Sequence, residues 1–287
     1  MNHGHTLAVA KFLRATRPAE HRRRGGRPVR QQQPDAIRLE YARALVDTTQ
    51  PMRKAAHAHD AEIVRLCAQA RRSDRRDATD DDRARAGQAK QLVERAARAA
   101  VDAMNPKRVV ADAEKYGART SAFQYAQLDK QVRQQIGVPL SIVERPARDL
   151  IPQFAAENVQ LVKTLPERDS GRIAALVDDA FSTGMHPETL ARALVDAEDA
   201  SEWDATRIAR DQIGKLNAQL NQVRQEALGV EAYFWRTMRD ERVRDEHDAL
   251  EGQRFTWNEP PAEGNPGEPV MCRCFADPDF SALIERL

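Results

Sequence analysis

The sequence predicts a mainly α-helical protein with a small α+β module near its C-terminus. The composition is 41% hydrophobic and 31% charged but only 5% aromatic, which suits solvent-exposed helices better than sheets. Apolar residues recur every three or four positions over residues 37–66, as on one face of an amphipathic helix. After Gly229 the pattern changes to a short apolar and aromatic run typical of a strand. A chain of 287 residues is long enough for one large or two modest cores.

Charge and cysteine content exclude several classes of protein. With 45 basic and 44 acidic residues, the net charge of +1 gives no reason to expect a general nucleic-acid binder. No run of about 18 apolar residues is present, so we expect no membrane span and no membrane partner. The N-terminus lacks a secretory pattern, and three cysteines do not make a disulfide framework. We therefore expect folding or assembly in a reducing cytoplasm.

Residues 1–34 are predicted to form a basic, flexible arm. Such a charge run repels itself and buries little surface. It either docks on nucleic acid or an acidic protein surface, or stays a solvated tail. The candidate nucleic-acid contacts are Arg22, Arg23, Arg24, Arg27 and Arg30.

Residues 35–165 are predicted to be a helical region. Pro51 predicts a kink or a break in the first helix. Cys67 lies on the apolar face and is interpreted as a small core residue. His57 and His59 are two residues apart and do not share a helix face, so a structural role is favoured over metal binding.

Charge-dense residues 71–86 predict a solvated turn, after which Asp80, Asp81 and Asp82 favour a helix N-terminus. That helix should end at Asn105-Pro106. Residues 166–229 are predicted to be the helical part of a second domain. Further helices are expected at 107–117, 120–136, 144–164, 167–183, from Pro187, and at about 202–228.

Residues 230–287 are predicted to form the small α+β module. We expect strands at 230–235, at 252–257 and over the VMCRCFA run at 270–276. The charged segment 240–250 fits about two helical turns over the sheet. A stiff loop over 259–269 holds four prolines and two glycines.

On such a strand Cys272 and Cys274 would share one face, with Arg273 on the other. Together with His247 they have the ligand types that zinc prefers. However, C-x-C is not the usual zinc spacing, and Asp240 or Asp245 would have to supply the fourth ligand. We favour a packed pair of thiols with no metal and with His247 hydrogen-bonded to a carboxylate, and keep zinc as the alternative.

Charged residues before His247 offer a second ambiguity. Asp240, Arg242, Arg244 and Asp245 resemble an acid–base centre, but arginines and carboxylates at helical spacing also form plain charge networks. The sequence has no Gly-rich phosphate loop, nucleophile elbow or metallohydrolase motif. We therefore expect association and no catalysis.

Order and spacing of residues in the second half match a known pattern. It consists of an R-I-A-R helix, then W-x-T-x-x-D-x-R-V-R-x-x-H-x-x-L-x-G, a Pro-Gly loop and C-R-C. The matching residues are Arg207 to Arg210, Trp235, Thr237, Asp240, Arg242, Val243, Arg244, His247, Leu250, Gly252, Phe255, Pro266, Gly267, Cys272, Arg273 and Cys274. Over roughly residues 170–276 the chain resembles the phage Mu F-like family of minor head proteins, also called phage head morphogenesis proteins. One departure is Asp211-Gln212, where the family often has a glutamate after a serine or threonine.

The resemblance implies a structural protein of a tailed-phage or prophage head, located at or near the portal vertex of the virion. Its implied partners are the portal protein and the major capsid protein, with packaged DNA a further candidate. We expect Trp235, Phe255 and Trp257 to form the core of the module. Around them, Asp240, Arg242, Arg244 and His247 would form a polar clasp.

Two alternative functions stay open. One is a DNA-binding ejection protein that acts through the basic arm. The other is a zinc-dependent enzyme or effector module, because the same module also occurs joined to toxin domains.

Overall fold

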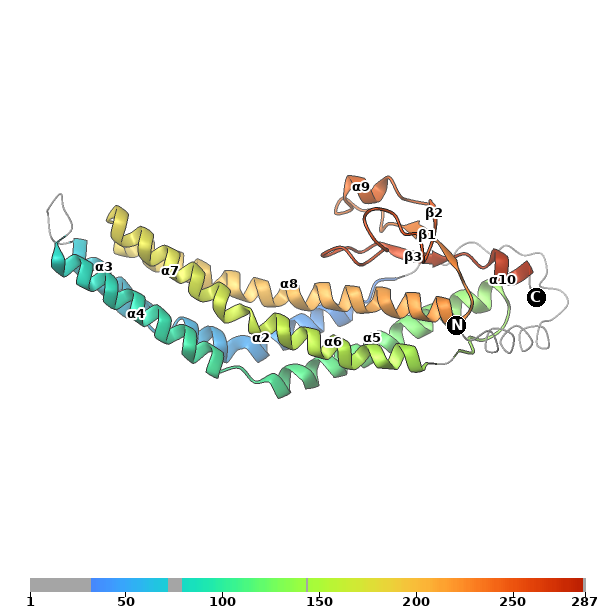
Figure 1. Ribbon diagram of the computed structural model, residues 1–287, viewed down its shortest axis with the longest axis horizontal. Helices are drawn as coiled ribbons and strands as arrows, with labels where there is room; N and C mark the ends of the chain where they lie inside the picture. Colours follow the sequence, from blue (N-terminus) through green and yellow to red (C-terminus); the bar gives the residue numbers. More distant parts are fainter. Residues whose placement is uncertain (1–31, 72–78, 143, 286–287) are drawn as a thin grey trace. The chain divides into compact units, whose positions relative to one another are not determined.

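A computed structural model describes residues 32–71, 79–142 and 144–285. Long helices dominate, and a three-stranded antiparallel sheet follows near the C-terminus (Figure 1). The predicted fold class is therefore confirmed. Among the residues so described, no helix combines the length and the apolar character needed to cross a bilayer.

The chain forms two compact units, each assembled from separate segments. Of the described residues, the first comprises 32–41, 113–142, 144–155 and 210–285, and the second comprises 42–71, 79–112 and 156–209. The boundaries predicted from the sequence, at residues 34, 165 and 229, stay predictions.

The second unit is built on helix packing. Its own helices are α3 (Asp60–Arg71), α4 (Asp80–Asp102) and α7 (Leu165–Thr183), and α4 runs alongside α7 (Figure 1). Their apolar faces and the beginning of the helix from Pro187 form a buried cluster that includes Ile63, Leu66, Cys67, Leu92, Val93, Ile173, Val177, Leu190 and Leu194. Cys67 is thus a core residue, as expected.

Helix α4 begins where its sequence predicts. Thr79 caps the helix, with its hydroxyl accepting from the Asp82 backbone N–H, while the Asp82 carboxylate accepts from the Thr79 N–H. This reciprocal pairing satisfies two of the four free donors at a helix start. Asp80 and Asp81 add negative charge to the first turn, where the helix dipole favours it.

Residues of four longer helices contribute to both units. They are α2 (Asp35–Ala56), α5 (Pro106–Gln135), α6 (Arg145–Lys163) and α8 (Pro187–Ala227). The first unit contains an apolar cluster beside the C-terminal helix α10 (Ser281–Glu285). The cluster combines the end of α5 with the segments that follow α5 and α8. Its members are Leu128, Val132, Ile136, Val138, Leu140, Leu228, Val230, Phe280 and Leu283.

Three predicted divisions between helices are absent in the described part of the chain. Helix α2 continues through Pro51 to Ala56 and the chain turns at residues 57–59, so the break at Pro51 is wrong and the alternative, a kink, stays a prediction. Helix α5 is continuous across Gly117. A Cβ on this residue would lie 3.3 Å from the Ile151 side chain, so the glycine allows close packing and does not end the helix. Helix α8 is one helix of 41 residues, which merges the two helices expected after Pro187.

The sheet has the order β2-β1-β3, with β1 (Ala232–Arg236) between β2 (Arg254–Thr256) and β3 (Phe275–Pro278) (Figure 1). Both neighbours pair antiparallel to β1, with Tyr233 opposite Phe255 and opposite Pro278. The first two strands agree with the sequence prediction. The third begins after the C-R-C run, because Met271 adopts φ 58° and residues 272–274 are irregular. The expected two helical turns are also shorter, a single turn at α9 (Asp245–Asp248).

The outer edge of β3 is covered by helix α8. The side-chain amides of Asn221 and Gln225 both donate to the carbonyl of Ala276, at 2.8 and 3.0 Å. Asn221 also accepts from Gln124 of α5 at 2.9 Å. These buried amides therefore tie the sheet to two helices of the same unit.

Arg224 of α8 is a buried cation with many partners. Its guanidinium donates to both carboxylate oxygens of Glu144, at 3.1 and 2.6 Å, in the planar two-point geometry that arginine favours. It also donates to the Ser121 carbonyl and hydroxyl and to Gln124. Since an unpaired buried charge is costly, this network makes Arg224 a structural link between α8, α5 and the start of α6.

Candidate functional site

Aromatic and sulfur-containing side chains form the core of the sheet module. Tyr233 and Trp235 of β1 are fully buried, and the Tyr233 ring centroid lies 4.4 Å from that of Trp257. Phe255 packs against this cluster, which also contains Cys272, Cys274 and Ala276. The three aromatic residues proposed from the sequence thus lie together.

His247 meets both cysteines inside this core. Its Nδ1 atom lies 3.6 Å from the Sγ atom of Cys272 and 3.6 Å from that of Cys274. All three side chains are buried, and their potential ligand atoms lie within 4.8 Å of one another. The other ring nitrogen, Nε2, has no hydrogen-bond partner, and the imidazole meets the Trp235 ring edge-on at 5.4 Å.

The backbone before β3 brings the sulfur atoms together. Met271 occupies the left-handed region, and its N–H donates to the Asp211 carboxylate of α8 at 2.6 Å. Two residues on, the Cys274 N–H points at the Cys272 sulfur at 3.4 Å. Gly267 has φ 93°, and a Cβ there would lie 2.5 Å from the Ala218 Cβ, so only glycine fits this approach to α8.

The pKa values of the two thiols are shifted in opposite directions. The pKa of Cys272 is lowered to about 6, chiefly because the Cys274 thiol donates to its thiolate. The same interaction, together with burial, raises the pKa of Cys274. One sulfur of the pair is therefore favoured as a thiolate at neutral pH, which is the form that binds metals.

A cavity of about 410 Å³ opens beside the three residues. All three residues line it, although each is buried. Five arginines and one carboxylate account for the charged lining. These residues are Arg38, Arg210, Arg242, Arg244, Arg273 and Asp35. The cavity therefore has a strongly positive lining, of the kind that attracts anions.

Arg38 is the buried member of that lining. Its side chain is 8% exposed, and its closest charged partner, Asp35, lies 3.5 Å away at the end of hydrogen-bond range. Burial lowers its pKa, although Asp35 acts in the opposite direction. Gly214 makes room for the guanidinium, because a Cβ there would lie 2.4 Å from its terminal nitrogen.

The proposed polar clasp is divided between different partners. Asp240 pairs with Arg273 of the C-R-C run and at 3.6 Å with Arg242. Arg244 donates to the Val270 carbonyl at 2.6 Å. Neither carboxylate suggested as a fourth zinc ligand joins the cluster: Asp240 holds Arg273, and Asp245 is exposed in the first turn of α9.

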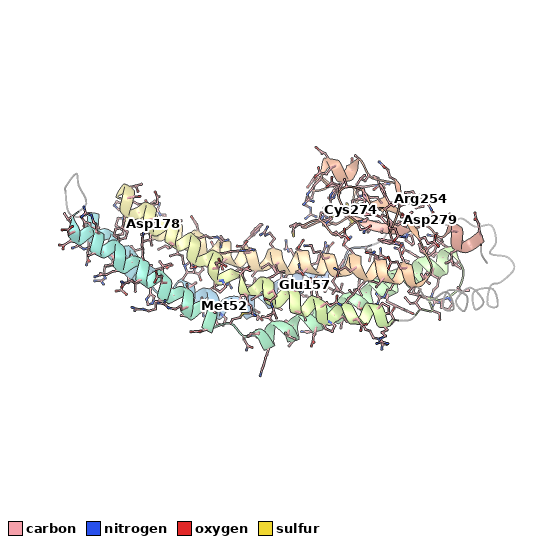
Figure 2. All side chains as sticks on the ribbon, in the orientation of Figure 1. Met52, Glu157, Asp178, Arg254, Cys274 and Asp279 are labelled. Carbon is pink, nitrogen blue, oxygen red and sulfur yellow. The ribbon has the colours of Figure 1, made fainter. Side chains whose placement is uncertain are left out.

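Thr237 and Gly252 belong to the β1–β2 connection. The Thr237 N–H donates to Glu251 at 2.6 Å, and the Gly252 N–H donates to the Trp235 carbonyl at 2.8 Å. Gly252 has φ 78°, which suits glycine. At the other end of the connection Arg254 and Asp279, labelled together in Figure 2, form an ion pair at 2.7 Å.

The arginine arm proposed for nucleic acid, from Arg22 to Arg30, lies outside the described residues. His57 does not meet His59 but pairs with Asp60 at 2.7 Å. Sequence reasoning missed Arg38 and Arg224. Both look like ordinary surface charges on a helix, and only Gly214, opposite Arg38, hints at a close approach.

Comparison with known proteins finds a similarity in the second half of the chain. Residues 171–276 match the family model described as phage Mu protein F like protein. An uncharacterized protein of Haemophilus influenzae (strain ATCC 51907 / DSM 11121 / KW20 / Rd) is 33% identical over 165 residues, which are 56% of this chain and 37% of the relative. The chain thus spans well under half the length of that relative. No solved structure matches the chain.

The predicted resemblance is therefore confirmed for residues 171–276. Over these residues the chain is similar to a family of phage head morphogenesis proteins.

Proposed function

Because residues 171–276 form a phage Mu F-like segment, we propose that this chain is a minor head protein of a tailed phage or prophage. It binds the portal protein and the major capsid protein during head assembly and stays at or near the portal vertex. It acts by association and not by catalysis.

The observation that carries this proposal is the family match itself. The matched residues include most of α7, the whole of α8 and the sheet module up to β3. Within the first unit, α8 and the sheet are joined by Asn221, Gln225 and the Gly267–Ala218 approach. The matched segment therefore includes a helix and a sheet that are tied together within one unit.

Head isolation from the encoding phage or prophage tests the proposal. We expect an epitope-tagged chain to copurify with heads at a low copy number relative to the major capsid protein. Deletion of its gene should leave heads that lack DNA or fail to form. Heads that form and fill normally without the chain would overturn the proposal.

A direct binding measurement separates the two partners. The purified chain is mixed with the portal protein or the major capsid protein of the same phage, and complexes are measured by light scattering after size exclusion. A complex with at least one of them supports the proposal, whereas no complex with either contradicts it.

Action as a DNA-binding ejection protein stays an alternative prediction, because the arm lies outside the described residues. It requires an affinity for DNA that falls steeply as the salt concentration rises. Deletion of residues 1–34 should remove this salt dependence. The zinc alternative has support of a different kind, since His247 and two cysteines form one buried cluster.

A further inference from the structure

A ring nitrogen that faces two sulfur atoms is unusual in an ordinary core. Nδ1 of His247 carries either one lone pair or one hydrogen, so it can make one hydrogen bond. It nevertheless lies 3.6 Å from both Cys272 Sγ and Cys274 Sγ. Hydrogen bonding alone therefore leaves one of these two contacts without a role.

The spacing agrees with three ligands around one ion. Zinc bonds of about 2.0 Å to nitrogen and about 2.3 Å to sulfur at a tetrahedral angle separate the two ligand atoms by about 3.5 Å, close to the two distances observed. Thiolate and imidazole are the ligands that zinc prefers. The cysteines are also unavailable to each other as a disulfide, because two residues apart they would close a strained ring.

Three protein ligands leave one tetrahedral position open. Among the residues that the structure describes, no fourth histidine, cysteine or carboxylate joins the cluster. All three ligands line the arginine-rich cavity, so the open position faces it. There the buried Arg38 has an Nε atom without a partner and only a distant carboxylate, which leaves donor capacity for an anion.

We propose that His247, Cys272 and Cys274 bind a zinc ion whose fourth position opens on the arginine-lined cavity and takes water or a small anion. This metal site goes beyond the proposed head function and does not rest on it. The ion fixes the irregular C-R-C run against α9, and the arginines favour an anionic fourth ligand over water.

Metal content of the purified full-length chain is the first test. We expect about one zinc per chain by mass spectrometry of the metal, in keeping with a single three-ligand site. Cys272→Ser, Cys274→Ser and His247→Ala should each lose most of it. Cys67→Ala is the matched control, because Cys67 is a buried cysteine of the other unit, and it should keep its zinc.

Cobalt substitution avoids the risk that these variants merely fail to fold. The wild-type chain is stripped with a chelator, shown to remain folded by circular dichroism, and titrated with Co²⁺. Thiolate-to-cobalt absorption together with tetrahedral d–d bands supports the site. A folded wild-type chain with almost no zinc and no such absorption overturns it.

Azide then tests the open position. In the cobalt-loaded chain we expect azide to shift the d–d bands, and Arg38→Gln to weaken azide binding about tenfold by removing one charge-assisted donor. A spectrum that does not respond to azide would show a closed fourth position and overturn that part of the proposal. An unchanged azide affinity in Arg38→Gln would show that Arg38 does not contribute to anion binding.

Discussion

Both units of the molecule contain apolar clusters, but the first also joins its sheet module to its helices through buried polar side chains. In the second unit, leucine, isoleucine, valine and alanine side chains from α3, α4, α7 and α8 share one apolar cluster. In the first unit, buried Asn221, Gln225 and Asp277 join the sheet module to its helices, and buried Arg224 joins helices to one another. An apolar cluster depends on volume, whereas a buried polar network depends on the identity and geometry of each partner.

The two units should therefore tolerate different kinds of substitution. A hydrophobic replacement of similar size should be accepted in the helical core. A replacement that keeps charge but changes geometry should not be accepted in the polar network. Trp203 is 60% exposed in the second unit, whereas Trp235 and Trp257 are buried in the first. In a Trp203→Phe background, tryptophan fluorescence therefore reports on the first unit alone.

Arg224→Leu should have the largest effect. It leaves Glu144, Gln124 and the Ser121 carbonyl without their cation, and breaking a buried pair costs about 4 kcal/mol. Urea unfolding followed by fluorescence in the Trp203→Phe background measures the loss. Arg133→Leu is the control, since Arg133 pairs with Asp129 on an exposed helix face and should cost under about 1 kcal/mol.

Arg224→Lys sharpens the same test. Lysine keeps the charge but cannot donate to both Glu144 oxygens in one plane, so we expect it to recover about half of the lost stability. Full recovery would mean that charge alone matters and would contradict the contrast between the units.

Leu190→Ala should have a similar but smaller effect in the second unit. Leu190 is fully buried in the apolar cluster, and truncation costs about 3 kcal/mol. Leu190→Met conserves volume and should cost under about 1.5 kcal/mol. Far-UV circular dichroism during urea unfolding checks both. A methionine variant as unstable as the alanine variant would show that shape, not volume, governs this core.

Replacing two glycines by alanine should change stability in opposite directions, because one is closely packed with a positive φ and the other has open space around it. Gly267→Ala places a Cβ 2.5 Å from Ala218 at φ 93°, so we expect a loss of about 2 kcal/mol. Gly171→Ala in the middle of α7 meets nothing within 4 Å and should stabilise the second unit by about 0.5–1 kcal/mol. Thermal unfolding of both variants measures these opposite signs.

Glu251→Gln should give the smallest effect, visible as a change in pH dependence. Burial alone raises the pKa of Glu251, but hydrogen bonds from Thr237 and Arg239 outweigh it and hold this pKa below its usual value. The resulting stabilisation is present above the unfolded pKa of about 4.3 and is lost as pH falls through the lower folded pKa. Stability curves of wild type and Glu251→Gln should therefore differ at pH 7 and converge in acid. Parallel curves would contradict this.

Local signals predicted much of the fold. Asp80, Asp81 and Asp82 indicated the start of α4, and the aromatic run after Gly229 indicated β1. The missed features depend on residues far apart in the chain. Gly117 looks like a helix breaker until Ile151 and Leu216 are seen against it.

The candidate site shows the same limit. The sequence suggested that His247, Cys272 and Cys274 belong together, because their types suit one ion. It placed the cysteines on a regular strand, whereas the Met271 backbone and the Asp211 side chain shape an irregular run. Neither Arg38 nor the cavity could be predicted, since Arg38 reaches the site from the beginning of the described chain.

The three-stranded sheet has two edges, β2 and β3, at which other strands could pair. An open sheet edge is a template on which foreign strands and identical chains can pair, and it invites aggregation during crowded assembly. Here the Ala276 carbonyl of the β3 edge is already occupied by Asn221 and Gln225, and the opposite edge strand β2 is only 3 residues long. The module is thereby protected from edge-to-edge polymerisation. A partner must recognise it through side chains, which makes recognition depend on sequence rather than on backbone pairing.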